Sequence, residues 1–174
     1  MIFLSLDRRV SILARLAGLV LVTWSVVGAA EDPAGTSGRG LVVTILLALC
    51  VLGALGWTAR RDLDSPPGPE VPVLAIAGGV LVGASPSTAA SAFVFVAIVS
   101  AGIRVGLVRA MQVAAAGALA LAVAVLIWDG GALGLVAYAL GFAASGLGAS
   151  NVRQLRQQAE QAELLLAQTQ RSHE

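Results

Sequence analysis

Long apolar runs separated by short polar breaks dominate the chain, and they predict helices that cross a membrane. A crossing helix needs about 20 apolar residues to pass through roughly 30 Å of hydrocarbon. The breaks between the runs carry charged residues, glycine or proline, which end or interrupt helices. Six spans are predicted, at about Val10 or Ser11 to Ala30, Leu41–Ala59, Pro72–Ala84, Ser87–Ile103, Val113–Trp128 and Ala132–Ala149.

The third and fourth spans share one apolar stretch, Val71–Val105, which is too long for a single crossing. Ser85-Pro86-Ser87-Thr88 divides this stretch, because proline after a small polar residue is a turn signal. Pro72–Ala84 is the shortest predicted span, so the pair is alternatively a re-entrant hairpin. Both alternatives return the chain to the same side of the membrane.

The N-terminal run has two interpretations. Arg8-Arg9, an apolar stretch and Gly28-Ala29-Ala30 resemble a secretory signal with a small-residue cleavage site. However, Arg15 interrupts the run, and enough apolar residues follow it for a tilted span. Because further spans follow, we expect an uncleaved first helix.

The composition changes after Ser150, where a run of strong helix formers without glycine or proline begins. Its apolar residues follow one another at steps of three and four, as do the a and d positions of a heptad repeat. The predicted core residues are Val152, Leu155, Ala159, Ala162 and Leu166, with Thr169 in the next d position. So short a repeat with alanine in its core is marginal alone. It either continues the sixth span or starts afresh with Asn151 as its cap.

This tail is either a solvated helix near the membrane surface or a parallel coiled coil in a dimer. Glutamines dominate it and its charges are mixed, unlike a basic interfacial helix, so we favour the coiled coil. The predicted fold class is all-α. A polytopic membrane helical bundle occupies residues 1–150, and a cytoplasmic coiled-coil-like helix occupies residues 151–174.

Composition and charge support this class and add a topology. Hydrophobic residues make up 57% of the chain and charged residues only 12%, where a soluble domain carries roughly a quarter. Lysine is absent, and every arginine except Arg39 falls on one side of the alternating spans. Short loops rich in basic residues stay cytoplasmic. We therefore expect a multi-pass plasma membrane protein with both termini in the cytoplasm.

Polar groups inside the predicted spans are hydroxyls, and no ionisable residue lies near the centre of a span. This pattern disfavours a proton-coupled transporter or an ion pump, which need charged groups at depth. We expect the hydroxyls to bond to carbonyls of their own helices. They belong to Thr23, Ser25, Thr44, Ser91, Ser100 and Ser145.

Small residues recur at the spacing that lets two helices approach closely. The pairs are Gly79-x-x-x-Gly83 and Gly102-x-x-x-Gly106, and the sixth span carries a similar stripe. That stripe consists of Ala137, Gly141, Ala144 and Gly148. We favour packing within the bundle for these residues, with a dimer face as the alternative.

Candidate chemistry is sparse. His173 is the only histidine and has no second metal ligand nearby in the sequence. No phosphate-binding glycine loop and no Gly-x-Ser-x-Gly motif occurs. Cys50 lies in an apolar run, and we expect a buried thiol that faces the membrane or packs within the bundle. We therefore predict no catalytic, cofactor-binding or metal-binding residue. The arginines are spread over separate loops, so no nucleic-acid partner is predicted either.

Residues Gln158–Ser172 resemble the juxtamembrane signalling helix of actinobacterial two-component sensor histidine kinases. In that family, several spans with small outer loops lead into such a helix. A dimerisation helix with a phospho-accepting histidine and an ATP-binding domain follow. The membrane part of this chain agrees with the family in layout only. The resemblance implies that the predicted heptad positions form the core of a dimeric signalling helix.

The departure from the family concerns the kinase half. His173 does not stand in a His-Asp motif, and no nucleotide-binding motif precedes Glu174. We expect residues 151–174 to be a signalling helix truncated before any kinase domain, so that the chain does not autophosphorylate by itself. Whether it is enzymatic therefore depends on a part that the sequence does not contain.

The predicted function is that of a sensory input region, which relays a membrane stimulus through a dimeric helix. Its expected partners are the lipid bilayer and a second copy of the chain. A response regulator would bind only through the missing kinase domain. The alternative is a small non-enzymatic membrane protein, such as an assembly or transporter-associated subunit.

Overall fold

The computed structural model describes residues 16, 20, 23, 24, 27, 38–59, 67–85, 90–128 and 132–172. The helices with continuous bounds in this part of the chain are α2 (Gly38–Ala59), α3 (Glu70–Ala84), α4 (Ser91–Arg104), α5 (Leu107–Trp128) and α6 (Ala132–Ser172). No described residue belongs to a strand, and the all-α prediction is confirmed. The predicted first span lies outside the described residues, apart from five separate positions.

In the part of the chain that the structure describes, two helices are long and apolar enough to cross a membrane. They are α5 and the part of α6 from Gly134 to Gln170. The apolar segment Val42–Trp57 of α2, and the whole of α3 and α4, are shorter. The 15 residues of α3 extend about 22 Å, less than the roughly 30 Å of a hydrocarbon core.

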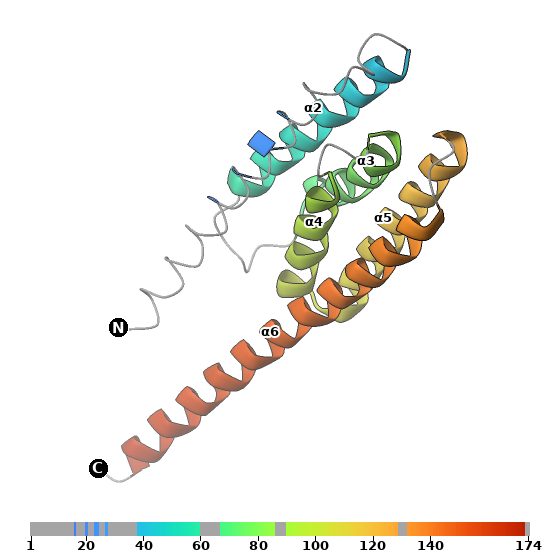
Figure 1. Ribbon diagram of the computed structural model, residues 1–174. Helices are drawn as coiled ribbons and strands as arrows, with labels where there is room; N and C mark the ends of the chain where they lie inside the picture. The colour runs from blue at the N-terminus through green and yellow to red at the C-terminus, as the bar shows by residue number, and fades with distance from the viewer. Residues whose placement is uncertain are drawn as a thin grey trace.

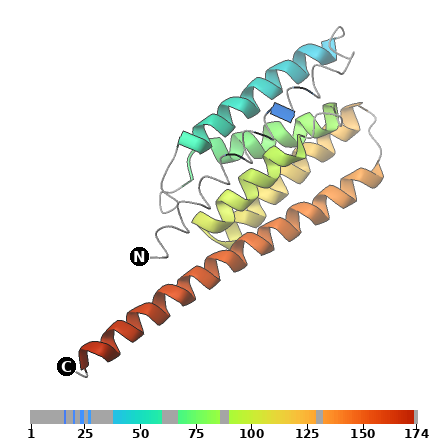
Figure 2. The same ribbon diagram turned by 60° about the vertical axis from the view of Figure 1, so that its left-hand side comes forward.

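The helices lie side by side in a bundle, with α2 on one side and α6 on the other (Figure 1). Several glycines fix their directions, because they lie against a neighbouring helix. Gly53 of α2 lies against Leu74 of α3, and Gly56 of α2 lies against Glu70, so these helices are antiparallel. We call residues 132–150 of α6 its membrane-length half and residues 151–172 its tail half. Figure 2 shows α3, α4 and α5 between α2 and the membrane-length half of α6.

The directions continue to alternate through the rest of the bundle. Gly102 of α4 lies against both Ala110 of α5 and Ala149 of α6, near the end where α4 finishes. Toward the other end, Gly83 of α3 lies against Ala124 of α5. Therefore α3 and α5 run one way, and α2, α4 and α6 run the other.

The centre of the bundle is α3, most of whose residues are buried because α2, α4 and α5 all pack against it. Close contact between α3 and α5 depends on glycine. A Cβ atom on Gly79 would collide with the carbonyl oxygen of Gly117, and one on Gly83 would collide with the Cβ of Ala124. The packing interpretation of Gly79 and Gly83 is confirmed.

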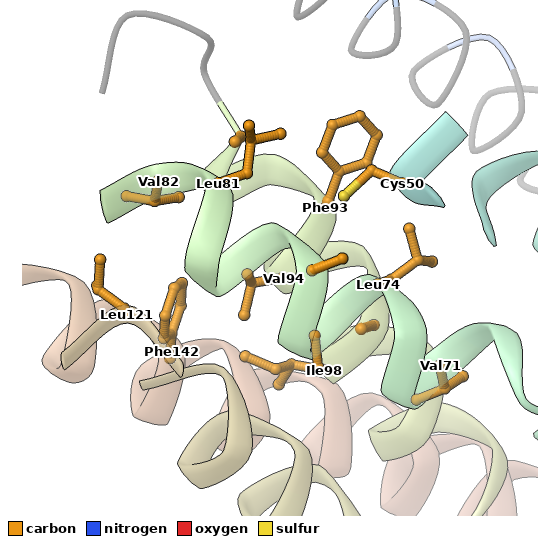
Figure 3. Close-up of a cluster of buried hydrophobic side chains, with 14 of the residues drawn as sticks. Cys50, Val71, Leu74, Leu81, Val82, Phe93, Val94, Ile98, Leu121 and Phe142 are labelled. Carbon is orange, nitrogen blue, oxygen red and sulfur yellow. The ribbon is translucent and has the colours of Figure 1, made fainter. Parts of the chain in front are cut away.

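Large apolar side chains fill the space around α3 and α4 (Figure 3). The ring of Phe142 meets that of Phe95 edge to face, with centroids 5.1 Å apart. Cys50 is fully buried in the same cluster, as expected for a packing thiol. Other fully buried members are Leu74, Leu81, Phe93, Val94 and Ile98.

The predicted bounds differ from the observed ones mainly at the start of α5. This helix begins at Leu107, six residues before the predicted Val113. The connection from α4 is only Val105-Gly106, and Gly106 has φ 123°, a left-handed conformation that glycine tolerates best. The prediction that Gly102 and Gly106 form one helical pair was wrong, because Gly106 lies outside both helices.

Two of the predicted hydroxyl bonds are confirmed, and a third hydroxyl bonds to another helix instead. Thr44 donates to the Gly40 carbonyl and Ser145 to the Phe142 carbonyl, each at 2.8 Å on its own helix. Ser100 instead accepts a hydrogen bond of 3.2 Å from the indole nitrogen of Trp57. This bond joins α2 to α4 across the bundle.

Candidate functional site

The five predicted core residues of the tail all lie on α6, which runs without a break from Ala132 to Ser172. The sixth span and the tail are therefore one helix, and Asn151 does not begin a new one. All five residues are exposed: Val152, Leu155, Ala159, Ala162 and Leu166. Leu155 and Leu166 are each 65% exposed, so no part of the bundle covers them.

The small-residue stripe of the same helix has a fixed relation to these five residues. Ala137, Gly141, Ala144 and Gly148 precede Leu155, Ala159, Ala162 and Leu166 by 18 positions each (for example 155 − 137 = 18). Eighteen residues make about five full turns of a straight α-helix. The stripe and the tail core therefore lie on one continuous face of α6, which we call the α6 face.

The membrane-length half of the α6 face is largely open. A Cβ atom on Gly148 would meet no atom within 4 Å, and Ala137 and Ala144 are exposed. Gly141 is half-buried, and a Cβ there would meet the ring of Phe95 at 3.4 Å. Unlike Gly79 and Gly83, this stripe, apart from Gly141, makes no close packing contact within the described part of the chain.

Three arginines gather at one end of the bundle, which we call the arginine end. Arg104 ends α4, Arg109 lies in the first turn of α5, and Arg153 follows the buried Ser150 on α6. The Nη1 atom of Arg153 lies 2.8 Å from the place where a Cβ on Gly106 would stand. Arg153 thus lies directly over the turn between α4 and α5, where the tail leaves the bundle.

A cavity of about 580 Å³ opens beside this turn. Its walls come from the start of α3, the end of α4 and the start of α5, and one of them carries Arg109. The Nη1 atom of Arg109 donates a hydrogen bond of 3.1 Å to Oε1 of Gln112, which also lines the cavity. The sequence analysis missed this site. Its only signal was the pair of arginines flanking Gly106 between two apolar runs.

Metal-ligating side chains are scattered over the described part of the chain. No group of three or more histidine, cysteine, aspartate or glutamate residues comes together there. His173 lies outside the described residues. The features that remain for function are the α6 face and the arginine-end cavity.

Comparison of the chain with protein-family models, curated proteins and solved structures finds no match. The function is therefore argued from the geometry of the chain.

Proposed function

We propose that this chain is the transmembrane input region of a two-component sensor histidine kinase, and that it signals as a dimer through α6. One observation carries the proposal above all others. A single uninterrupted helix joins the bundle to a tail of exposed apolar residues, and one face continues along both parts.

The proposal places the bundle in a membrane. Apolar side chains point outward from α5 and α6, and Leu126 is 83% exposed. Such faces are rare on soluble monomers but suit a lipid solvent. Both helices also have the length and composition of membrane spans.

Six crossings are proposed, with the N- and C-termini in the cytoplasm. The alternating directions of α2 to α6 support this count for the described helices. The short α3 lies beside α5 from the level of Val113 to that of Ala124, so the pair α3 and α4 reaches across most of the bundle. Arg104, Arg109 and Arg153 share one end, and the positive-inside rule assigns that end to the cytoplasm.

The partner on the α6 face is a second copy of the chain in parallel orientation. Glycine and alanine in the membrane allow two helices to approach closely, where lipid offers no hydrophobic force. Beyond the membrane, Val152, Leu155 and Leu166 supply a water-excluding core at heptad spacing. A symmetric dimer covers both halves of the α6 face at once, because each copy presents the same face to the other.

Signalling then follows from the rigidity of one long helix. A change in the bundle that rotates or shifts α6 is carried into the tail core, since no flexible joint separates them. The resemblance of Gln158–Ser172 to kinase signalling helices supports a kinase domain as the receiver. A response regulator would bind only through that domain.

Disulfide crosslinking in native membranes tests the proposal. Single cysteines are placed along Val152–Thr169 in a Cys50→Ala background, because Cys50 is the only native cysteine and is fully buried. Crosslinks should peak at Val152, Leu155, Ala159, Ala162 and Leu166. Leu164 is the matched control, because it is equally exposed at 66% but lies off the α6 face.

A flat profile, with Leu164 crosslinking as well as Leu155, would overturn the parallel dimer. The chain would then be better explained as a small non-enzymatic membrane protein whose function resides in the bundle alone.

A further inference from the structure

The arginine-end cavity has the size and chemistry of a binding site. Its volume of about 580 Å³ lies within the roughly 300–1,000 Å³ typical of small-molecule pockets. Most of its wall is apolar, with Val71, Ala75, Val113 and Ala116 among the lining residues. Such walls accept hydrocarbon and exclude water.

The polar groups of the cavity lie together on α5. Arg109 supplies a permanent positive charge, and Gln112, one turn further on, accepts a hydrogen bond from it and still offers an amide donor. Among the described residues, no acidic side chain lines the cavity. The nearby Glu70 is buried against Gly56 of α2, and its Oε1 accepts from the backbone nitrogen of Gly68 at 3.0 Å. An apolar pocket with one cationic edge fits a ligand that is apolar at one end and anionic at the other.

We propose that the cavity binds an anionic phospholipid of the cytoplasmic leaflet, with its phosphate at Arg109 and Gln112 and its acyl chain along the apolar wall. This inference rests on the proposed membrane placement, and it deepens the proposed function by naming the class of the stimulus. Basic pockets between helices on the cytoplasmic side of membrane proteins hold such headgroups.

The position of the cavity connects this lipid to the signalling helix. Val105 lines the cavity, and the next residue, Gly106, forms the turn that Arg153 covers. In Figure 2 this turn lies at the end of the bundle from which the tail half of α6 projects. A lipid phosphate bound at Arg109 therefore lies three residues along the chain from Gly106, the turn residue that Arg153 covers.

Photo-crosslinking of the full chain in nanodiscs tests the site. The probe is phosphatidylglycerol with a diazirine on its acyl chain, diluted into phosphatidylcholine, and labelled peptides are mapped by mass spectrometry. Labelling should concentrate on residues 105–116. It should fall about tenfold in Arg109→Gln, because one charge-assisted hydrogen bond is lost. Ala116→Leu, which fills the cavity, should lower it similarly.

Two matched variants separate the cavity from general effects. Ala115→Leu adds the same side chain at the neighbouring exposed position, and Arg171→Gln removes one charge near the end of the tail. Both should label like the unchanged chain. Equal labelling by a phosphatidylcholine probe, or equal loss in Ala115→Leu, would overturn the proposal. Competition by millimolar inorganic phosphate would show that a free anion rather than a lipid is bound, and would also overturn it.

Failure of this inference is distinguishable from failure of the proposed function. Tail crosslinks at Leu155 and Leu166 report the dimer whatever lipid surrounds the bundle. If those crosslinks persist while residues 105–116 are not labelled, only the lipid site is wrong.

Discussion

The helix α3 and the tail half of α6 are both continuous helices, but they differ in where their partners lie. Most residues of α3 are buried by three neighbouring helices, and its glycines allow the backbone of α5 to approach closely. In the tail, Leu155, Leu164 and Leu166 are each about two-thirds exposed. The sequence of α3 is thus explained by this chain alone, and that of the tail is not.

This difference separates residues that maintain the fold from residues that need a partner. Substitutions in α3 should affect the folding of the bundle. Substitutions in the tail should leave the bundle intact and affect association. A variant that changes folding from the tail, or association from α3, would break this distinction.

Gly79→Ala should destabilise the bundle by about 3 kcal/mol, because the new Cβ collides with the Gly117 carbonyl oxygen and the backbones must separate. Unfolding in detergent, followed by circular dichroism during titration with a denaturing detergent, measures the loss. Gly148→Ala is the matched control, since a Cβ there meets nothing within 4 Å. It should be neutral or slightly stabilising, as alanine is the better helix former. Similar losses in both variants would contradict the assignment of Gly79 to internal packing.

Leu155→Glu combined with Leu166→Glu should lower tail crosslinking through Ala159→Cys at least tenfold, because two charges enter a water-excluding core. The bundle should unfold as before, since both side chains are largely exposed. Leu164→Glu adds a charge at an equally exposed position off the α6 face and should retain crosslinking. Unchanged yield in the double variant would refute a coiled coil in this register.

Inserting two residues after Asn151 should disconnect the two halves of the α6 face. The insertion rotates the tail by about 200° relative to the bundle. The two halves of the α6 face should then no longer face the partner chain at the same time. Of the crosslinks through Gly148→Cys and through Leu155→Cys, the weaker one should fall in yield about fivefold. A seven-residue insertion changes the face by only about 20° and is the control. Two strong crosslinks after the two-residue insertion would mean that the halves associate independently.

The sequence predicted the described helices well where an apolar run ends at charged residues. Thus α2 ends at Ala59, before Arg60-Arg61, as expected. The start of α5 was misplaced because Arg104 and Arg109 were assigned to one loop. Arginine is a good helix former, and Gly106 alone makes the turn, so Arg109 lies inside the helix.

The candidate sites divide in the same way. The tail core was visible in the sequence because it depends on spacing along one helix. Its pairing with a second chain stays a prediction. The cavity was not visible, because Val71, Val105 and Arg109 come from three helices that only tertiary packing brings together. The continuity of α6 past Asn151 was left open, since asparagine caps helices as readily as it tolerates an exposed position within one.

Ser100→Ala should have the smallest effect, a loss of about 0.6 kcal/mol in bundle stability, as is typical of hydrogen bonds inside membrane proteins. The hydroxyl of Ser100 accepts the indole N–H of Trp57, and its removal leaves that donor unpaired at the contact between α2 and α4. Trp57→Phe in the Ser100→Ala background removes the donor as well, and a double-mutant cycle in detergent measures the coupling between the two. Ser145→Ala, which breaks only a bond within α6, is the control for loss of a hydroxyl.

The cycle should give a coupling for Trp57 and Ser100 but none for Trp57 and Ser145. A zero coupling for both pairs would mean that the hydrogen bond between Trp57 and Ser100 does not stabilise the bundle. Tail crosslinking should not change in any of these variants, because the bond lies in the self-contained part of the chain.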